Sequence, residues 1–132
     1  MKYILDTSFV LGYINPQDSN HTKVMQQVAE IQFYEDDEIY ISDCIYAELL
    51  TVTKRKKNTY LLPTLYKTIE ARKTKNISTN LRIFLGIYQK IETYCSVQDI
   101  SVILHALEYN AIILSCDEEL IETAYSLGYE YE

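Results

Sequence analysis

The sequence predicts an α/β fold, a three-layer α/β/α sandwich with a mainly parallel central sheet. Short apolar segments typical of strands alternate with longer segments whose apolar residues recur at helical spacing. Two segments with strand character, 2–5 and 111–114, run directly into polar residues that can begin a helix. The segment 111–114 is apolar throughout, as expected for a strand covered on both faces. With 132 residues, the chain is expected to form one domain over residues 1–132.

The individual elements follow from local patterns of apolar, capping and helix-breaking residues. Strands are expected at 2–5, 39–41 and 111–114, with a last short strand at 129–131. Helices are expected to begin after Asp6-Thr7-Ser8, at Ser19 or Asn20, at Ser42 or Asp43, at Leu61-Leu62-Pro63, at Leu81, at Ser96 and at Ser115 to Glu118. Residues 76–80 are expected to form a break, without helical structure, between two helices, and Gly128 is expected to end the last helix.

The charge is divided unevenly along the chain. The formal net charge is −7, which is unusual for a protein that handles nucleic acid. However, residues 54–75 hold eight of the twelve Lys and Arg residues and one acid, so this segment carries +7 and the remainder −14. Lys54, Arg55, Lys56 and Lys57 are its densest part and are candidates for binding RNA phosphates. A solvated basic helix end, favoured by the helix dipole, is an equally good interpretation.

The cysteines and histidines do not support a zinc site or a disulfide framework. The three cysteines, Cys44, Cys95 and Cys116, have no CxxC spacing, and buried free thiols are expected. His21 and His105 are far apart in sequence and form no paired ligand motif. The N-terminal apolar run is interrupted by Asp6, and no stretch reaches the length of a membrane span. A cytoplasmic protein without a membrane segment is therefore expected.

Four acids occupy positions where an ordinary surface acid would be unusual. Asp6 and Asp117 follow predicted strands, Asp99 lies in the first turn of an apolar helix, and Glu48 lies in a mainly apolar stretch. Each alone could be a helix cap or a solvated acid. Parallel strands place functional residues at their carboxyl ends, and clustered carboxylates become tolerable when a divalent cation neutralises them. Oxygen ligands favour Mg²⁺ or Mn²⁺, which suits phosphodiester hydrolysis by activated water.

These residues resemble the PIN domain family, and within it the stand-alone VapC-like toxins. The likeness rests on Leu5-Asp6-Thr7-Ser8, on Ser42-x5-Glu48-Leu49, on Asp99 at a helix start and on Leu114-Ser115-Cys116-Asp117. It covers essentially the whole chain in order. Two features depart from the pattern: Leu120 stands where an aromatic residue is usual, and Ile100, Val102 and Ile103 replace an alanine-rich helix. These departures affect packing more than chemistry.

The resemblance implies Mg²⁺- or Mn²⁺-dependent cleavage of single-stranded RNA. It assigns metal binding and catalysis to Asp6, Glu48, Asp99 and Asp117, with Ser8 and Ser115 as hydrogen-bond partners of these acids. Asp6 and Asp99 are expected to hold the principal metal ion. Glu48 would bind metal or orient water, and Asp117 would complete the site or hold a second ion. VapC-like relatives are typically homodimers neutralised by a cognate antitoxin, so the resemblance also implies these two partners.

Two other functions are compatible with an α/β chain of this size. The first is a catalytically weak PIN-fold protein that binds RNA or acts as a scaffold, because a complete set of acids can still be inactive. The second is a signalling receiver domain, which also has an acidic Mg²⁺ pocket. Receivers need adjacent acids after the first strand, whereas Thr7 follows Asp6 here, and Lys90 does not follow a late strand. The receiver interpretation is therefore disfavoured.

Overall fold

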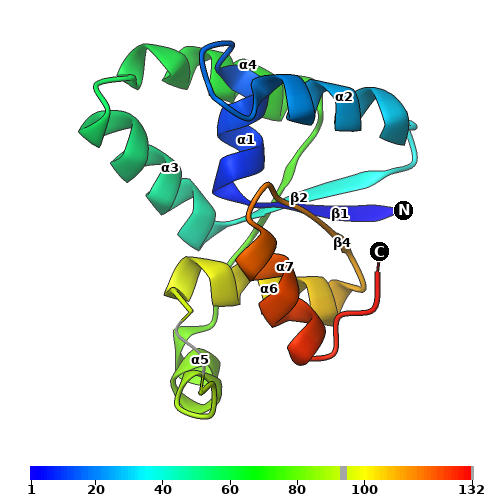
Figure 1. Cartoon of the computed structure of the whole chain (residues 1–132), viewed down its shortest axis with the longest axis vertical. Helices are drawn as coiled ribbons and strands as arrows, with labels where there is room; N and C mark the ends of the chain where they lie inside the picture. Colours follow the sequence, from blue (N-terminus) through cyan, green and yellow to red (C-terminus); the bar gives the residue numbers. More distant parts are fainter. Residues whose placement is uncertain (93–94, 132) are drawn as a thin grey trace.

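A four-stranded parallel sheet forms the centre of the computed structural model, which describes residues 1–92 and 95–131 (Figure 1). Its strands are β1 (Lys2–Leu5), β2 (Glu38–Ser42), β3 (Lys75–Ile77) and β4 (Ile112–Leu114). They lie in the order β3-β2-β1-β4, and each described strand pair is parallel. This arrangement confirms the predicted α/β class and the predicted parallel sheet.

Helices cover both faces of this sheet. They are α1 (Thr7–Ile14), α2 (His21–Ile31), α3 (Asp43–Arg55), α4 (Leu62–Ala71), α5 (Leu81–Tyr88), α6 (Val97–Tyr109) and α7 (Glu118–Ser126), with a 3-10 turn at Thr59–Leu61. Figure 1 shows α1, α2 and α4 on one side of the sheet and α6 and α7 on the other, while α3 extends beyond the strand ends. None of the helices in the described part of the chain has the length and apolarity of a membrane span.

Two predicted features at the sheet edges are wrong. Residues 75–77 form the edge strand β3, although residues 76–80 were expected to be a break between helices. Only Ile77 of its three side chains is buried, so the segment lacks the apolar pattern by which a strand is recognised. Residues 129–131 do not form a strand. Instead, the Tyr129 hydroxyl accepts a hydrogen bond from the backbone N–H of Ile113 at 2.8 Å. The Tyr129 side chain thus satisfies a backbone N–H group of β4 that would otherwise need the carbonyl group of a neighbouring strand.

Two apolar clusters form the core. The larger includes Ile45 and Leu49 of α3 and Ile100 and Ile103 of α6, all fully buried. The smaller lies between the sheet and helices α1 and α2. Toward the end of α6 the apolar side chains are not all buried, since Leu107 is 38% exposed.

Gly12 allows α1 and α2 to pack closely. A Cβ atom at this position would lie 2.7 Å from Cγ2 of Val24, which is too close for an unshifted structure. His21, the first residue of α2, also lies with its Nδ1 2.7 Å from the carbonyl oxygen of Gly12. The close approach fixes α1, whose first residue directly follows Asp6.

Candidate active site

The strand order places a crevice at the carboxyl ends of β1 and β4. From β1 the chain adds β2 and then β3 on one side, and later places β4 on the other side. Such a reversal of strand order opens a crevice beyond the strand ends in parallel sheets. Asp6 follows β1 and residues 115–117 follow β4, and Leu5 pairs with Leu114 in register. The predicted acids Asp6 and Asp117 therefore lie on the two sides of this crevice.

Asp6 is held in place by two serine hydroxyls. Its carboxylate Oδ2 accepts hydrogen bonds from Ser115 Oγ at 2.7 Å and from Ser8 Oγ at 2.9 Å. Asp6 is 4% exposed, and it does not cap α1 through its side chain as an ordinary N-terminal acid would. The described hydrogen bonds of its carboxylate both end on Oδ2, and Oδ1 has no partner among the described residues.

The same serines connect Asp6 to the loop after β4. Ser115 Oγ accepts a hydrogen bond from the backbone N–H of Asp117 at 3.0 Å. Ser8 Oγ likewise accepts one from the backbone N–H of Cys116 at 3.0 Å. Each hydroxyl thus uses its proton on Asp6 and its lone pairs on the loop. The structure brings Ser8 and Ser115 into hydrogen-bond contact with Asp6, and the family resemblance implied such contacts with the acids.

Asp117 and Asp99 each begin a helix beside this network. Asp117 is the N-cap of α7, and its Oδ1 accepts hydrogen bonds from the backbone N–H groups of Glu119 at 3.0 Å and Leu120 at 3.3 Å. Asp99 lies in the first turn of α6, where its backbone N–H donates to Ser96 Oγ at 3.1 Å. Asp117 therefore caps a helix through its carboxylate, whereas Asp99 contributes only its backbone N–H to the cap that Ser96 provides.

The pKa of Asp99 responds to the charges of the other three predicted acids. Burial, followed by the negative charge of Asp6, is the main cause that raises the pKa of Asp99 to about 6. The charges of Asp117 and Glu48 act in the same direction on this pKa, while a hydrogen bond with Ser96 opposes them. Carboxylates that lie close together repel one another, and a bound cation would be favourable because it neutralises this repulsion.

Glu48 reaches the region from α3, whose start is tied to α6 by buried serines. Ser42 Oγ accepts a hydrogen bond from the backbone N–H of Ile45 at 3.3 Å and lies 2.9 Å from Ser101 Oγ. Ser101 Oγ donates to the carbonyl oxygen of Gln98 at 2.7 Å. Because each hydroxyl has one proton, Ser42 must donate to Ser101. This directed chain fixes the helix that carries Glu48 against the helix that carries Asp99.

The donor set fits a hard cation, but the side chains are loosely spaced. Carboxylate and hydroxyl oxygens are the ligands that Mg²⁺ and Mn²⁺ prefer. Within residues 1–92 and 95–131, however, no three His, Cys, Asp or Glu side chains come together as a ready-made metal site. Direct binding by three acids would need side-chain rotation. A Mg²⁺ ion keeps several of its water ligands, so binding to the acids through these waters would need less side-chain rotation.

The structure places the basic cluster Lys54 to Lys57 at the C-terminal end of α3, beyond Glu48. These residues are all exposed, at and just beyond the end of α3. At 1.5 Å per residue, Lys54 lies about 9 Å farther along the helix axis than Glu48. The cluster shares a helix with one predicted catalytic acid, but none of its side chains forms an ion pair among the described residues.

Sequence reasoning missed two features beside the acids. Cys95 is a buried thiol whose pKa rises to about 11 through burial and the charges of Asp99 and Asp117, so it lies close to the acidic crevice. Nothing in its sequence context distinguishes it from an ordinary core cysteine. The other is the pair Ser42 and Ser101, since only Ser42 was predicted, as a helix cap. All three cysteines are free.

Fold and site together define a class: a parallel α/β protein with a carboxylate cluster at its strand-order reversal. The PIN domain family matches residues 3–125, and the chain therefore belongs to that family. No curated protein sequence matches the chain.

Solved structures share this fold. The chain is similar to VapC20 of Mycobacterium tuberculosis, described as a toxin that cleaves the sarcin-ricin loop, with a TM-score of 0.73 and 12% identity over 92% of this chain and 94% of the other. It is similar to VapBC2 of Rickettsia felis bound to a promoter DNA fragment, with a TM-score of 0.62 and 21% identity over 92% of both chains. A domain of unknown function from Methanocaldococcus jannaschii has a TM-score of 0.58 and 20% identity, over 98% and 87%.

Proposed function

We propose that this chain is a Mg²⁺- or Mn²⁺-dependent endoribonuclease that hydrolyses RNA phosphodiester bonds, and that it is the toxin of a toxin–antitoxin pair. The observation that carries the proposal is the position of Asp6, whose carboxylate is held by Ser8 and Ser115 at the carboxyl end of β1, beside the loop of Asp117 that follows the neighbouring strand β4. Asp99 lies near enough for the charges of Asp6 and Asp117 to raise its pKa. When bound, the cation would supply an activated water and a positive charge opposite the phosphate. Membership of the PIN family and the fold of VapC20 support the same activity.

Within this proposal each acid has a role. Asp6, held by Ser8 and Ser115, and Asp99 are the ligands of the principal ion, directly or through water. Glu48 binds the ion or orients the attacking water. Asp117 has one oxygen engaged as a helix cap, which leaves the other to complete the site or to hold a second, weaker ion.

The test is RNA cleavage by the wild type and by matched variants. Wild type with Mn²⁺ and a mixture of structured and single-stranded RNA is expected to cleave, and Asp99→Asn is expected to lose cleavage. Glu119→Gln is the control, because Glu119 is an exposed acid in the first turn of α7 outside the set of four. Cleavage that persists in Asp99→Asn, or that disappears equally in Glu119→Gln, would contradict the assigned site.

The alternative, a catalytically weak PIN-fold protein that binds RNA or acts as a scaffold, has one observation in its favour. The acids do not form a ready-made three-ligand metal site among the described residues. The two functions differ in what Mn²⁺ does. An enzyme should gain thermal stability from Mn²⁺ by mass action, and Asp6→Asn should lose most of that gain. RNA binding without cleavage, together with equal Mn²⁺ shifts in both proteins, would favour the alternative.

RNA contact is proposed for the cluster Lys54 to Lys57. These four exposed cations stand at the end of the helix that carries Glu48, and the remainder of the chain is strongly acidic. They would bind backbone phosphates, which makes the affinity depend on salt rather than on base sequence.

Two protein partners belong to the proposal. The VapBC2 structure supports a cognate antitoxin for this chain, and co-expression with the protein encoded by a neighbouring reading frame tests it by rescue of growth. A homodimer is supported by α5, a helix at the edge of the molecule (Figure 1) whose side chains Leu81, Ile83, Leu85 and Tyr88 are exposed. Apolar patches of this kind mark association surfaces. Leu85→Glu should convert a dimer to a monomer in light scattering after size-exclusion chromatography, and an unchanged mass would reject α5 as the interface.

A further inference from the structure

His105 is a buried titratable group that has no role in the proposed nuclease reaction. It lies in α6, one turn after Ser101 and on the same face of the helix, and it is 4% exposed. Its ring nitrogen Nδ1 is buried and has no hydrogen-bond partner among the described residues. A protonated imidazole has an N–H group on both ring nitrogens, so protonation would add a buried donor at Nδ1 that has no acceptor.

The ring of His105 packs against Phe84, the residue that attaches α5 to the rest of the domain. The two ring centres lie 6.3 Å apart, and the ring planes are inclined by 43°. Among the residues of α5, Phe84 is the one whose side chain is buried, whereas Leu81, Ile83 and Leu85 are mostly exposed. A separate helix as short as α5 is not stable in water. The order of α5 therefore depends on the contact between Phe84 and the body of the domain.

The surroundings of His105 oppose a positive charge on its ring. Burial lowers the pKa of His105 below its ordinary value of 6.5, while the charges of Glu108 and Asp43 act in the opposite direction. Glu108 is an exposed residue of the same helix. Asp43, at the start of α3, already accepts hydrogen bonds on both carboxylate oxygens, from the backbone N–H and the hydroxyl of Thr79. From α5, His105 meets the uncharged ring of Phe84.

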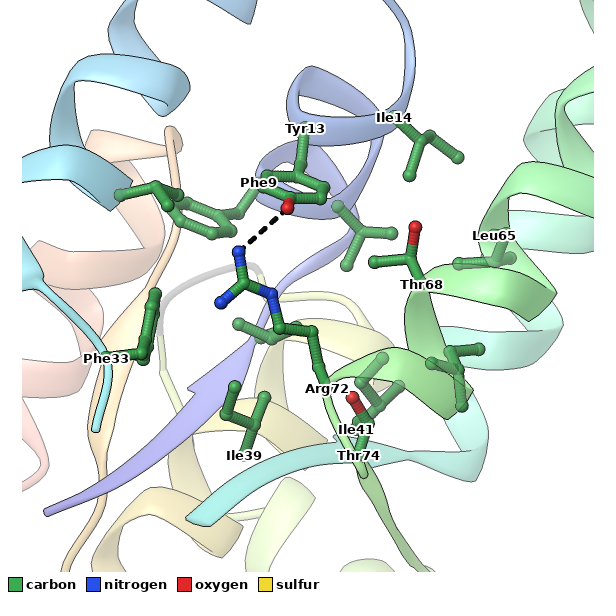
Figure 2. Close-up of a pocket in the computed structure, with 14 residues that line it drawn as sticks. Phe9, Tyr13, Ile14, Phe33, Ile39, Ile41, Leu65, Thr68, Arg72 and Thr74 are labelled. Atoms are coloured by element: carbon green, nitrogen blue, oxygen red, sulfur yellow. Dashed lines mark hydrogen bonds between the residues drawn. The ribbon is translucent and has the colours of Figure 1, made fainter. Parts of the chain in front are cut away.

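Arg72 illustrates what a cation beside aromatic rings requires (Figure 2). Its guanidinium carbon lies 5.6 Å from the centre of the Tyr13 ring and 5.5 Å from that of Phe33, within the range of a cation–π contact. Its Nη2 also donates a hydrogen bond to the Tyr13 hydroxyl at 2.9 Å, and the side chain is exposed to water. A charged His105 would be buried, would lack a partner for Nδ1, and would lie beyond the cation–π range of about 6 Å from Phe84.

We propose that protonation of His105 releases Phe84, and with it α5, from the body of the domain, so that α5 is docked at neutral pH and loosened in mild acid. When Phe84 moves away, water reaches the imidazolium and removes the penalty of burying its charge. The docked state binds a proton less readily than the released state, so the released fraction rises as the pH falls below about 6.5. This inference does not depend on the proposed nuclease function.

The test is hydrogen–deuterium exchange of α5 amides at pH 7.5 and pH 5.0, measured by mass spectrometry and corrected for the pH dependence of the chemical exchange step. We expect the protection of α5 in the wild type to fall by at least about threefold at pH 5.0. His21→Gln is the matched control and should respond like the wild type, because His21 is the other histidine of the chain and lies in α2. His105→Gln and His105→Leu cannot take up the proton and should keep the protection of α5 equal at both pH values.

An NMR titration of the two wild-type histidines provides a test that needs no variant. The His105 ring signals should titrate over the pH range in which α5 loses protection. Equal protection of α5 at both pH values in the wild type would overturn the proposal, as would an equal fall in the two His105 variants. Leu85→Glu should keep the response, and its absence there would overturn the proposal by assigning the effect to dissociation of a dimer. Protonation of Asp99 stabilises the fold, because its pKa is raised, so Asp99 does not account for a loss of protection in acid.

Discussion

Replacing Asp99 by asparagine is expected to stabilise the metal-free protein near neutral pH and to change its stability little at pH 4. Burial and the charges of Asp6, Asp117 and Glu48 raise the pKa of Asp99 to about 6 from an ordinary value of 3.8. Between these two values the folded protein holds a proton that the unfolded chain has released. Stability therefore falls as the pH rises through this window, because the unfolded state binds fewer protons than the folded state.

The size of the effect follows from the shift. A change of about 2 pKa units corresponds to about 3 kcal/mol at most, since one unit is about 1.4 kcal/mol. The Asp99 side chain is only half-buried, so solvent screening reduces this value, and we expect about 1–2 kcal/mol at pH 7.5. Asparagine has no charge to release, so Asp99→Asn should recover this free energy of unfolding.

The assay is urea unfolding of both proteins in EDTA at pH 4, 5, 6 and 7.5. The difference between variant and wild type should grow from under about 0.5 kcal/mol at pH 4 to its full value at pH 7.5. Glu119→Gln should show no such trend. A variant that is less stable than the wild type at pH 7.5, or a difference that does not depend on pH, would refute the electrostatic account of Asp99.

Three further predictions concern the serine network, the core and the basic cluster. Ser115→Ala should weaken Mn²⁺ affinity about 10- to 100-fold, measured by electron paramagnetic resonance of free Mn²⁺, because Asp6 loses its shorter hydrogen bond; unchanged affinity would contradict a positioning role. Leu49→Ala should lower the free energy of unfolding by about 2–5 kcal/mol in urea, because Leu49 is fully buried, and a loss under about 1 kcal/mol would mean that the core is looser than described. Replacing Lys54 and Lys57 by glutamine should lower the slope of log K for RNA binding against log salt concentration by about one to two. An unchanged slope would mean that the RNA does not contact this cluster.

The sequence predicted most of the fold because the central elements have strong local signals. The apolar runs of β1, β2 and β4 and the capping serines Ser42 and Ser96 mark their elements without reference to the rest of the chain. The edge strand β3 has no such signal, since its pattern is two exposed residues followed by Ile77. Its existence depends on pairing with β2, which is a long-range interaction that a local pattern does not encode.

The candidate site was predictable to the extent that strand ends determine positions. Asp6 and Asp117 follow neighbouring parallel strands, so their proximity follows from topology. The position of Glu48 came from the family resemblance, because a helix position alone does not say what it faces. The pair Ser42 and Ser101, 59 residues apart, depends on how α3 packs on α6, and only the three-dimensional structure reveals it.

The position of β1 in the sheet has a consequence for the lifetime of the site. β1 has neighbours on both sides, and the backbone N–H of Asp6 continues the ladder by donating to the carbonyl oxygen of Leu114 at 3.0 Å. Amides of such a central strand exchange with deuterium mainly through global unfolding, whereas exposed helices such as α5 open by themselves. Fluctuations that loosen α5 therefore leave the Asp6 carboxylate and its serine partners in place.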